Sequence, residues 1–231
     1  MHVIFETILD LVFPSHCVGC STYLPHGRLL CDSCEKKIPL HHTLFCATCN
    51  ARLPYGTRVC HPTAPYLLGA AASYAEHTIR ELIHRMKFAR VSRASEPLAG
   101  LMVRYLRALP HPIAFDCVIP VPLGTTRERT RGFNQASLLA IQIAADFQKP
   151  LLIDSLVRTR DTAPQSELRS ADERNENVAG CFAAQSERLG KHKNVLLIDD
   201  VTTSGATLRE AARALRAAGA RHVIAVVAAK A

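Results

Sequence analysis

The sequence contains no tryptophan, and aromatic residues of all kinds make up only 6% of its 231 residues. Extensive stacking on nucleic-acid bases needs aromatic side chains, so that mode of binding is disfavoured. No apolar run approaches the roughly 20 residues of a membrane-spanning helix, so we expect no membrane insertion. Residues 1–10 are apolar but carry Glu6 and Asp10 and no basic stretch. They predict a short amphipathic helix, not a signal peptide, and hence a cytoplasmic protein.

Composition excludes a disordered chain, because 48% of the residues are hydrophobic and 21% are charged. The length suits one α/β domain with a small appendage. The formal net charge of +8 favours polyanionic partners, either nucleic acid or a pyrophosphate substrate. A basic surface that only keeps the protein soluble would give the same net charge.

Cysteine is concentrated at one end, with seven of the nine residues among the first 60. Each C-x-x-C turn presents two thiolates, and two such turns complete a structural zinc site, here Cys17, Cys20, Cys31 and Cys34. A second site has Cys46, Cys49 and Cys60, with His61 as a candidate fourth ligand. Thr63 stands where another C-x-x-C would end, so this site is rebuilt with His61, degraded or empty. We expect a zinc-binding segment over 1–66 and an α/β domain over 67–231.

Strands and helices alternate in the predicted α/β domain, which indicates a mostly parallel sheet with right-handed crossovers. Apolar runs predict strands at 66–74, 116–122, 177–182, 195–198 and 222–229. Helical periodicity predicts helices at 76–90, 98–109, 134–147 and 208–218.

The stretch 195–208 carries the strongest functional signal. Asp199 and Asp200 follow a buried strand at its carboxyl end, where open α/β sheets bind their ligands. Hydroxyls, a glycine and the first N–H groups of a helix come next, and such a helix start binds anions. Carboxylates beside a phosphate cradle predict a phosphorylated sugar; the alternative is an ordinary strand-turn-helix. The lysine of a Walker A loop and the three glycines of a dinucleotide fingerprint are missing.

Two further segments are basic. Arg127, Arg129 and Arg131 follow the strand at 116–122, and guanidinium forks bind phosphate oxygens bidentately. The residues from 122 to 131 therefore predict a phosphate-binding loop or a solvated basic loop. The long polar stretch 156–177 predicts either a lid or a plain surface excursion.

The stretch 195–208 resembles the phosphoribosyl pyrophosphate (PRPP) signature of type I phosphoribosyltransferases. The resemblance implies a type I phosphoribosyltransferase-like α/β fold, with a mostly parallel sheet flanked by helices and a small N-terminal zinc-ribbon-like segment. It implies that PRPP binds through Asp199, Asp200, Thr202, Thr203, Ser204, Gly205, Ala206 and Thr207. It implies that pyrophosphate binds with Mg²⁺ at Pro122, Leu123, Arg127 and Arg131. It makes the 156–177 stretch a lid that carries Arg158, Gln165 and Arg174.

With the C-x-x-C pairs, Met86-Lys87-Phe88 and Arg131-Gly-Phe-Asn-Gln135 added, nearly the whole chain resembles the ComF family of competence-associated proteins. The resemblance implies a role in DNA uptake during natural transformation. It implies PRPP or a related phosphorylated ribose as ligand, and phosphoribosyl transfer with Mg-pyrophosphate leaving, but names no acceptor. The alternative is a non-catalytic module for single-stranded DNA or competence proteins. That module would use the basic residues Arg80, Lys87, Arg90 and Arg93 and reuse the phosphate site.

Overall fold

The computed structural model describes residues 15–54, 60–162 and 170–231. The helix predicted at 1–10 lies outside these residues, as does Gln165. None of the helices in the described ranges combines the length and apolar character that a membrane crossing needs.

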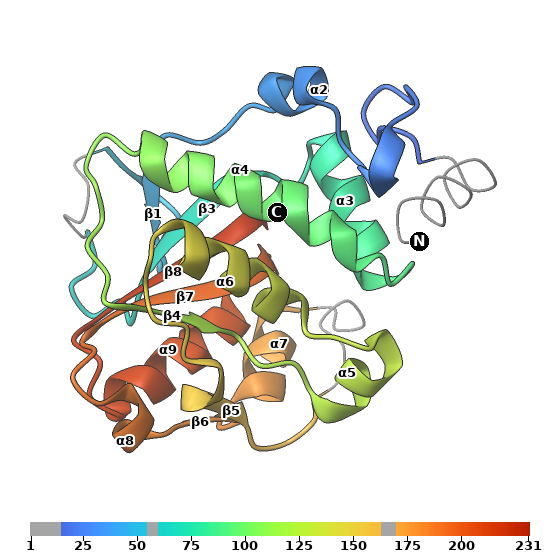
Figure 1. The fold of residues 1–231 in the computed structure, drawn as a ribbon. Coiled ribbons are helices and arrows are strands. Elements are labelled where there is room, and N and C mark those ends of the chain that lie inside the picture. The colour runs from blue at the N-terminus through green and yellow to red at the C-terminus, as the bar shows by residue number, and fades with distance from the viewer. Residues whose placement is uncertain (1–14, 55–59, 163–169) are drawn as a thin grey trace.

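A six-stranded sheet forms the centre of the molecule, in the order β2-β1-β3-β8-β7-β4 (Figure 1). The strands β3 (Leu67–Ser73), β8 (His222–Lys230), β7 (Asn194–Thr202) and β4 (Cys117–Pro120) are parallel. At one edge, β1 (Leu44–Cys46) and β2 (Arg52–Leu53) continue the sheet in the antiparallel sense. The prediction of a mostly parallel sheet is confirmed.

Helices cover both faces of this sheet (Figure 1). One face carries α3 (His77–Lys87), α4 (Ser95–Ala108) and α6 (Gln135–Asp146). The other carries α9 (Ala206–Ala217), α8 (Ser186–Leu189) and a small antiparallel sheet of β5 (Leu156–Arg158) and β6 (Phe182–Ala184). Alternate residues of β7 serve the two cores: Leu196 packs toward α4 and α6, and Leu197 toward α9. Burial on both sides explains why this strand is an unbroken apolar run.

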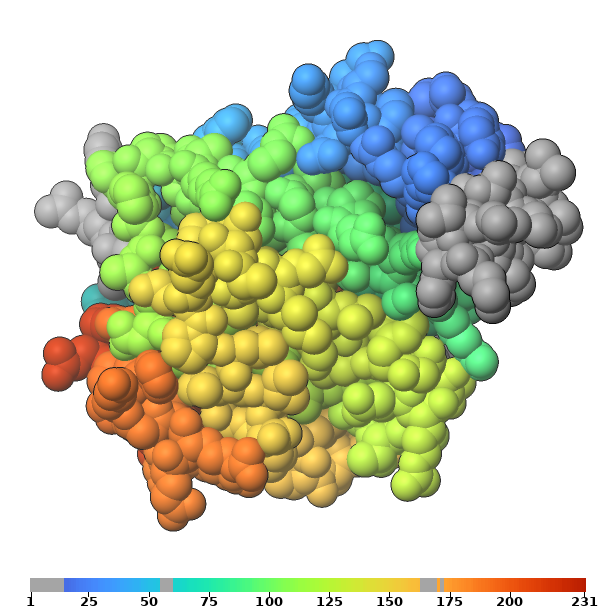
Figure 2. Space-filling model, viewed as in Figure 1, coloured from blue at the N-terminus to red at the C-terminus, as the bar shows by residue number. Residues whose placement is uncertain are grey.

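The N-terminal segment packs directly on the α/β layers. It contains α2 (Asp32–Lys37) and the strands β1 and β2. Leu24 and Leu30 share a core with Ile79 and Leu82 of α3, and Figure 2 shows this segment lying against the α3–α4 side of the molecule. The hydroxyl of Tyr105 in α4 donates to the Thr43 carbonyl at 2.8 Å. Through β1, the segment is part of the main sheet.

The strand predicted at 177–182 is wrong. Residues 171–178 form the helix α7 (Ala171–Val178), and β6 begins only at Phe182. The start of α7 is fixed by a capping box between Ser170 and Glu173, which satisfies two backbone N–H groups at the helix end. Gly180, with φ of 66°, separates α7 from β6.

Candidate functional site

A pocket of about 650 Å³ opens at the carboxyl ends of β4 and β7. Its volume is typical of sites for small ligands. Its charged lining residues are Lys87, Arg90, Arg127, Arg131, Arg158, Arg174, Asp199 and Asp200. Five arginines and one lysine face two aspartates, so the pocket favours an anionic ligand that also brings hydroxyls or a cation for the acids.

The two aspartates lie within β7, which the sequence predicted to end at Ile198. The strand pairs with β8 as far as Thr202, whereas β4 pairs only up to Ile198. Beyond that point β4 has ended, and the pocket opens beside the last residues of β7. Successive strand residues point to opposite faces, so the carboxylates reach the pocket from the two sides of the sheet.

Asp200 forms a nearly buried ion pair with the last residue of α3. The ammonium of Lys87 lies 2.9 Å from its carboxylate, with 17% and 6% of the two side chains exposed. Breaking such a pair leaves an uncompensated charge, so both groups are held in place unless a ligand takes over one of them.

Of the four basic residues proposed from the sequence for nucleic-acid binding, Lys87 and Arg90 lie at the pocket. Lys87 and Arg90 line the pocket, whereas Arg93 donates to the backbone carbonyl of His26 at 3.1 Å, and Arg80 is exposed on α3 away from the lining. Arg80 and Arg93 are therefore not among the residues that line the pocket.

Asp199 has a pKa well above the usual value of an aspartate. Burial, followed by the neighbouring Asp200 carboxylate, raises the pKa of Asp199 to about 7, while Lys87 acts in the opposite direction. Its side chain accepts the backbone N–H of Asp200 at 2.9 Å. The group therefore changes charge near neutral pH.

The loop after β7 presents the start of α9 to the pocket. Thr202, Thr203, Gly205, Ala206 and Thr207 line it, and Ser204 accepts the N–H of Ala206 through its hydroxyl at 3.4 Å. The first N–H groups of a helix have no intrahelical acceptor and carry the positive end of its dipole. The predicted anion cradle and the two aspartates therefore face the same pocket.

Gly205 is required by both conformation and space. Its φ is 73°, and a Cβ added there would lie 2.6 Å from the hydroxyl oxygen of Tyr66. We expect Gly205→Ala to lower the free energy of unfolding by about 1–3 kcal/mol, because a non-glycine residue in this region is strained. Urea denaturation measures this change in the free energy of unfolding. The control is Gly100→Ala in the interior of α4, where the added methyl meets open space; it should stabilise by about 0.5–1 kcal/mol. Equal effects at the two glycines would contradict this account of the loop.

The arginines after β4 lie on a helix, not on the predicted loop. Residues 125–131 form α5 (Thr125–Arg131), which ends at Gly132 with φ of 85°. Residues four apart share a helix face, so Arg127 and Arg131 both line the pocket with Pro122 and Leu123, whereas Arg129 does not.

The predicted lid is bounded by regular structure. Arg158 is on β5 and Arg174 is on α7, and both line the pocket. The Arg158 guanidinium donates to the Thr162 hydroxyl and lies 5.1 Å from the centre of the Phe182 ring. These two arginines are therefore attached to elements that pack against α9, and Gln165 lies outside the described residues.

Gln135 is a pocket residue that the sequence analysis did not select. It is 3% exposed, and its side-chain oxygen accepts from Arg131 at 2.8 Å. An arginine only donates, so the oxygen of Gln135 must face it. The amide nitrogen is left with no partner among the described residues. The spacing of Arg131 and Gln135, four residues apart across a helix start, was the available signal.

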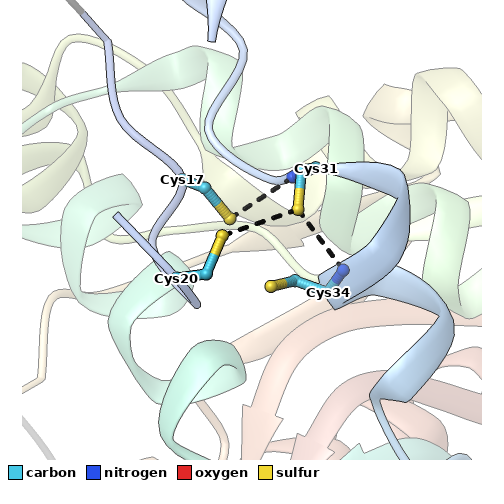
Figure 3. A group of neighbouring side chains, drawn as sticks. All are labelled: Cys17, Cys20, Cys31 and Cys34. Carbon is cyan, nitrogen blue, oxygen red and sulfur yellow. Dashed lines mark hydrogen bonds between the residues drawn. The ribbon is translucent and has the colours of Figure 1, made fainter. Parts of the chain in front are cut away.

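Two groups of side chains that could hold a metal ion lie in the N-terminal segment. In the first, the sulfurs of Cys17, Cys20, Cys31 and Cys34 all lie within 4.8 Å of one another (Figure 3). Cys20 and Cys31 are 3.8 Å apart, about the separation that a tetrahedron with Zn–S bonds of about 2.3 Å requires. Backbone N–H groups point at two of these sulfurs, as suits thiolates.

The second group is completed by histidine. Cys46, Cys49, Cys60 and His61 also place their ligand atoms within 4.8 Å. The Nδ1 atom of His61 lies 3.4 Å from the Cys46 sulfur and 3.3 Å from the Cys60 sulfur. Of the three alternatives for this site, the geometry fits the set rebuilt with His61.

Comparison with known proteins matches both parts of the chain. Residues 8–64 match a double zinc ribbon domain, and residues 129–231 match a phosphoribosyl transferase domain. Competence protein F of Haemophilus influenzae is 31% identical, covering 90% of this chain and 92% of its own. The DNA utilization protein YhgH of Escherichia coli K12 is 31% identical, covering 92% and 96%.

Two more distant similarities involve Bacillus subtilis. Its competence protein ComFC is 34% identical over 42% of this chain and 37% of its own. The solved structure of its glutamine PRPP amidotransferase aligns with a TM-score of 0.44 and 20% identity, covering 64% of this chain and 30% of its own. The full-length matches at above 30% identity carry the assignment: this chain belongs to the ComF family, in which a double zinc ribbon precedes a phosphoribosyl transferase domain of the type I fold.

Proposed function

We propose that the pocket binds PRPP with Mg²⁺ and transfers its phosphoribosyl group. The observation that carries the proposal is the convergence of three features on one pocket: an acid pair, a helix start and a set of arginines. A 5′-phosphate suits the N–H groups at 203–207, ribose hydroxyls suit the carboxylates of Asp199 and Asp200, and pyrophosphate suits Arg127 and Arg131.

The proposed reaction needs no nucleophile from the protein, because the acceptor forms the new bond. The bond from the anomeric carbon to pyrophosphate breaks, the acceptor supplies the new bond, and positive charge develops on the ribose in between, as in glycoside chemistry. The carboxylates of Asp199 and Asp200 lower the energy of that charge. The guanidinium groups of Arg127 and Arg131 stabilise the departing pyrophosphate. Arg158 and Arg174, on β5 and α7, add positive charge to the wall of the pocket for the departing pyrophosphate.

The carboxylates fit a magnesium ion delivered with the substrate, because Mg²⁺ in proteins is held by one or two carboxylates together with substrate phosphates. When bound, it neutralises charge on pyrophosphate. Zinc has a structural role in this proposal, because four protein ligands leave no position for water.

We place this activity in DNA uptake, since relatives covering most of the chain are named competence protein F and DNA utilization protein. Single-stranded DNA and other competence proteins are the partners that this setting implies. Zinc binding needs reduced thiolates, which supports a reducing compartment such as the cytoplasm. The division into a zinc-binding unit over 1–66 and a transferase unit over 67–231 remains part of the proposal.

The second candidate function is a non-catalytic module in which a DNA phosphate occupies the cradle. The five arginines of the pocket favour it as much as they favour pyrophosphate. Contacts to DNA phosphates release counterions, so affinity for a strand should fall steeply with salt. PRPP that is displaced by a single-stranded oligonucleotide at low salt would show that both ligands use one pocket.

The test of the proposal uses the pH response of Asp199. In this proposal the ionised form of Asp199, not the protonated form, accepts ribose hydroxyls. Because the pKa of Asp199 is about 7, PRPP affinity should rise about tenfold from pH 6 to pH 8. Titration calorimetry with Mg²⁺ measures this, with Asp199→Asn as the control for titration of the ligand phosphates. A similar pH response in both proteins, or no binding by the wild type, would contradict the proposal.

The stability of the unliganded protein should change with pH in the opposite direction to PRPP affinity. The unfolded pKa of an aspartate is near 3.9. Because folding raises the pKa of Asp199, its contribution to stability is complete below about pH 4 and is lost as the pH rises through about 7.

A further inference from the structure

Phe88 is an exposed aromatic residue on the wall of the pocket. The residue is 66% exposed, more than the other large exposed hydrophobic residues of the described chain, Tyr23, Ile141 and Ile153. Of these four, Phe88 is the one that lines the pocket. Burial of apolar surface is favourable, so a ligand that covers this exposed phenyl ring gains binding free energy.

Two side chains lie beside the Phe88 ring, and a backbone hydrogen bond holds its main chain. The backbone N–H of Phe88 closes α3 by donating to the His84 carbonyl at 2.9 Å. The His84 ring lies 4.9 Å away between centres, at 39°. The guanidinium carbon of Arg131 lies 5.9 Å from the centre of the Phe88 ring, within the range of a cation–π interaction. These contacts restrict the Phe88 ring, so a ligand that stacks on it loses less free energy in ordering the side chain.

Arg131 connects this ring to the interior of the pocket. Its guanidinium donates to the buried Gln135 and so has a fixed orientation. The residue beside Phe88, Lys87, reaches Asp200. A ligand lying on the Phe88 ring therefore has phosphate- and sugar-binding groups next to it. A flat ring, a ribose and a phosphate joined in that order constitute a nucleotide.

We propose that Phe88 is the stacking platform for a nucleobase ring, either the acceptor of the transfer or a base of a DNA strand. This inference rests on the proposed function, because it places the ring next to the bound ribose phosphate. Contact through one exposed face depends on ring area, not on hydrogen-bonding edges. Recognition should therefore tolerate different bases, with purines bound more tightly than pyrimidines.

The absence of tryptophan from the sequence gives a direct test. In F88W the new indole is the single tryptophan of the chain, and a stacked base should quench its emission. Adenosine and uridine 5′-monophosphates and a 5′-phosphorylated oligonucleotide should each quench it, whereas ribose 5-phosphate should not. The control is I141W on α6, at a residue that is 47% exposed and outside the pocket lining; its emission should not respond.

Affinities complete the test. Adenosine 5′-monophosphate should bind the wild type more tightly than ribose 5-phosphate does, and F88A should reduce that preference by about 5- to 100-fold. If only the oligonucleotide loses affinity in F88A, the stacked base belongs to a DNA strand, and the assignment of Phe88 as a stacking platform is supported. If ribose 5-phosphate binds but no base-bearing ligand gains affinity or quenches F88W, the platform is contradicted and the proposed function stands. If ribose 5-phosphate does not bind, the proposed function fails, and this inference fails with it.

Discussion

Asp200→Asn should weaken PRPP binding about 10- to 100-fold, because hydrogen bonds to a charged group contribute about 1.5–3 kcal/mol. The substitution keeps the size of the side chain and removes the charge that Lys87 contacts at 2.9 Å. It also leaves the Lys87 ammonium without its counter-charge in a largely buried position. Both ligand affinity and fold stability should therefore fall, the first measured by calorimetry and the second by urea denaturation.

A second substitution separates the two effects. The double variant Lys87→Met with Asp200→Asn removes the stranded charge, so stability should recover while PRPP affinity stays low. Asp146→Asn is the matched surface control, since Asp146 pairs with Arg107 at 2.8 Å outside the pocket. PRPP affinity that is the same in Asp200→Asn as in Asp146→Asn would rule out Asp200 as a ligand-binding group.

Removal of the proposed zinc ligand Cys34 should have the largest effect on stability. Structural zinc contributes about 10–16 kcal/mol to small domains, as much as the whole net stability of a typical protein. Cys34→Ser should release one equivalent of zinc and unfold the region around α2. Because Leu24 and Leu30 share a core with α3, the loss should also lower the PRPP affinity that depends on Lys87.

Metal analysis and thermal unfolding together test this prediction. Cys181→Ala is the control, because Cys181 is buried and belongs to neither ligand group. It should keep its zinc and lose only the stability of a small cavity. Cys49→Ser should release a different equivalent, from the site that His61 completes. A wild-type protein purified with reduced thiols but without zinc would contradict both assignments.

The sequence predicted the elements with a strong local pattern. The apolar run before Asp199 and the paired cysteines each have a local physical cause: burial on both faces of a strand, and ligand spacing around a tetrahedral ion. The glycine and hydroxyls at 202–207 likewise indicated the turn into α9. The strand prediction ended too early at Ile198 because polar residues normally mark a strand end, whereas pairing with β8 carries β7 on to Thr202.

The contacts that complete the pocket could not be predicted in the same way. Lys87 lies in α3 and Asp200 in β7, and only the packing of that helix on the sheet brings them together. Helical periodicity placed Lys87 on a polar face of its helix. A residue on such a face can contact either solvent or a buried carboxylate, and the sequence does not distinguish the two. The contact between Arg131 and Gln135 is different, because the two residues are only four apart in the sequence and their spacing could have indicated it. The helix α7 lies mostly within the polar stretch 156–177, and its capping box between Ser170 and Glu173 was the local sequence signal for it.

Hydrogen exchange on addition of PRPP and Mg²⁺ tests the location of the site most directly. Ligand contacts slow the exchange of the amides they hold. We predict protection in peptides that cover residues 199–207 and 122–131, reduced in Asp200→Asn. Protection confined to residues 15–54, or none in either predicted segment at saturating PRPP, would contradict a ribose-phosphate site at the ends of β4 and β7.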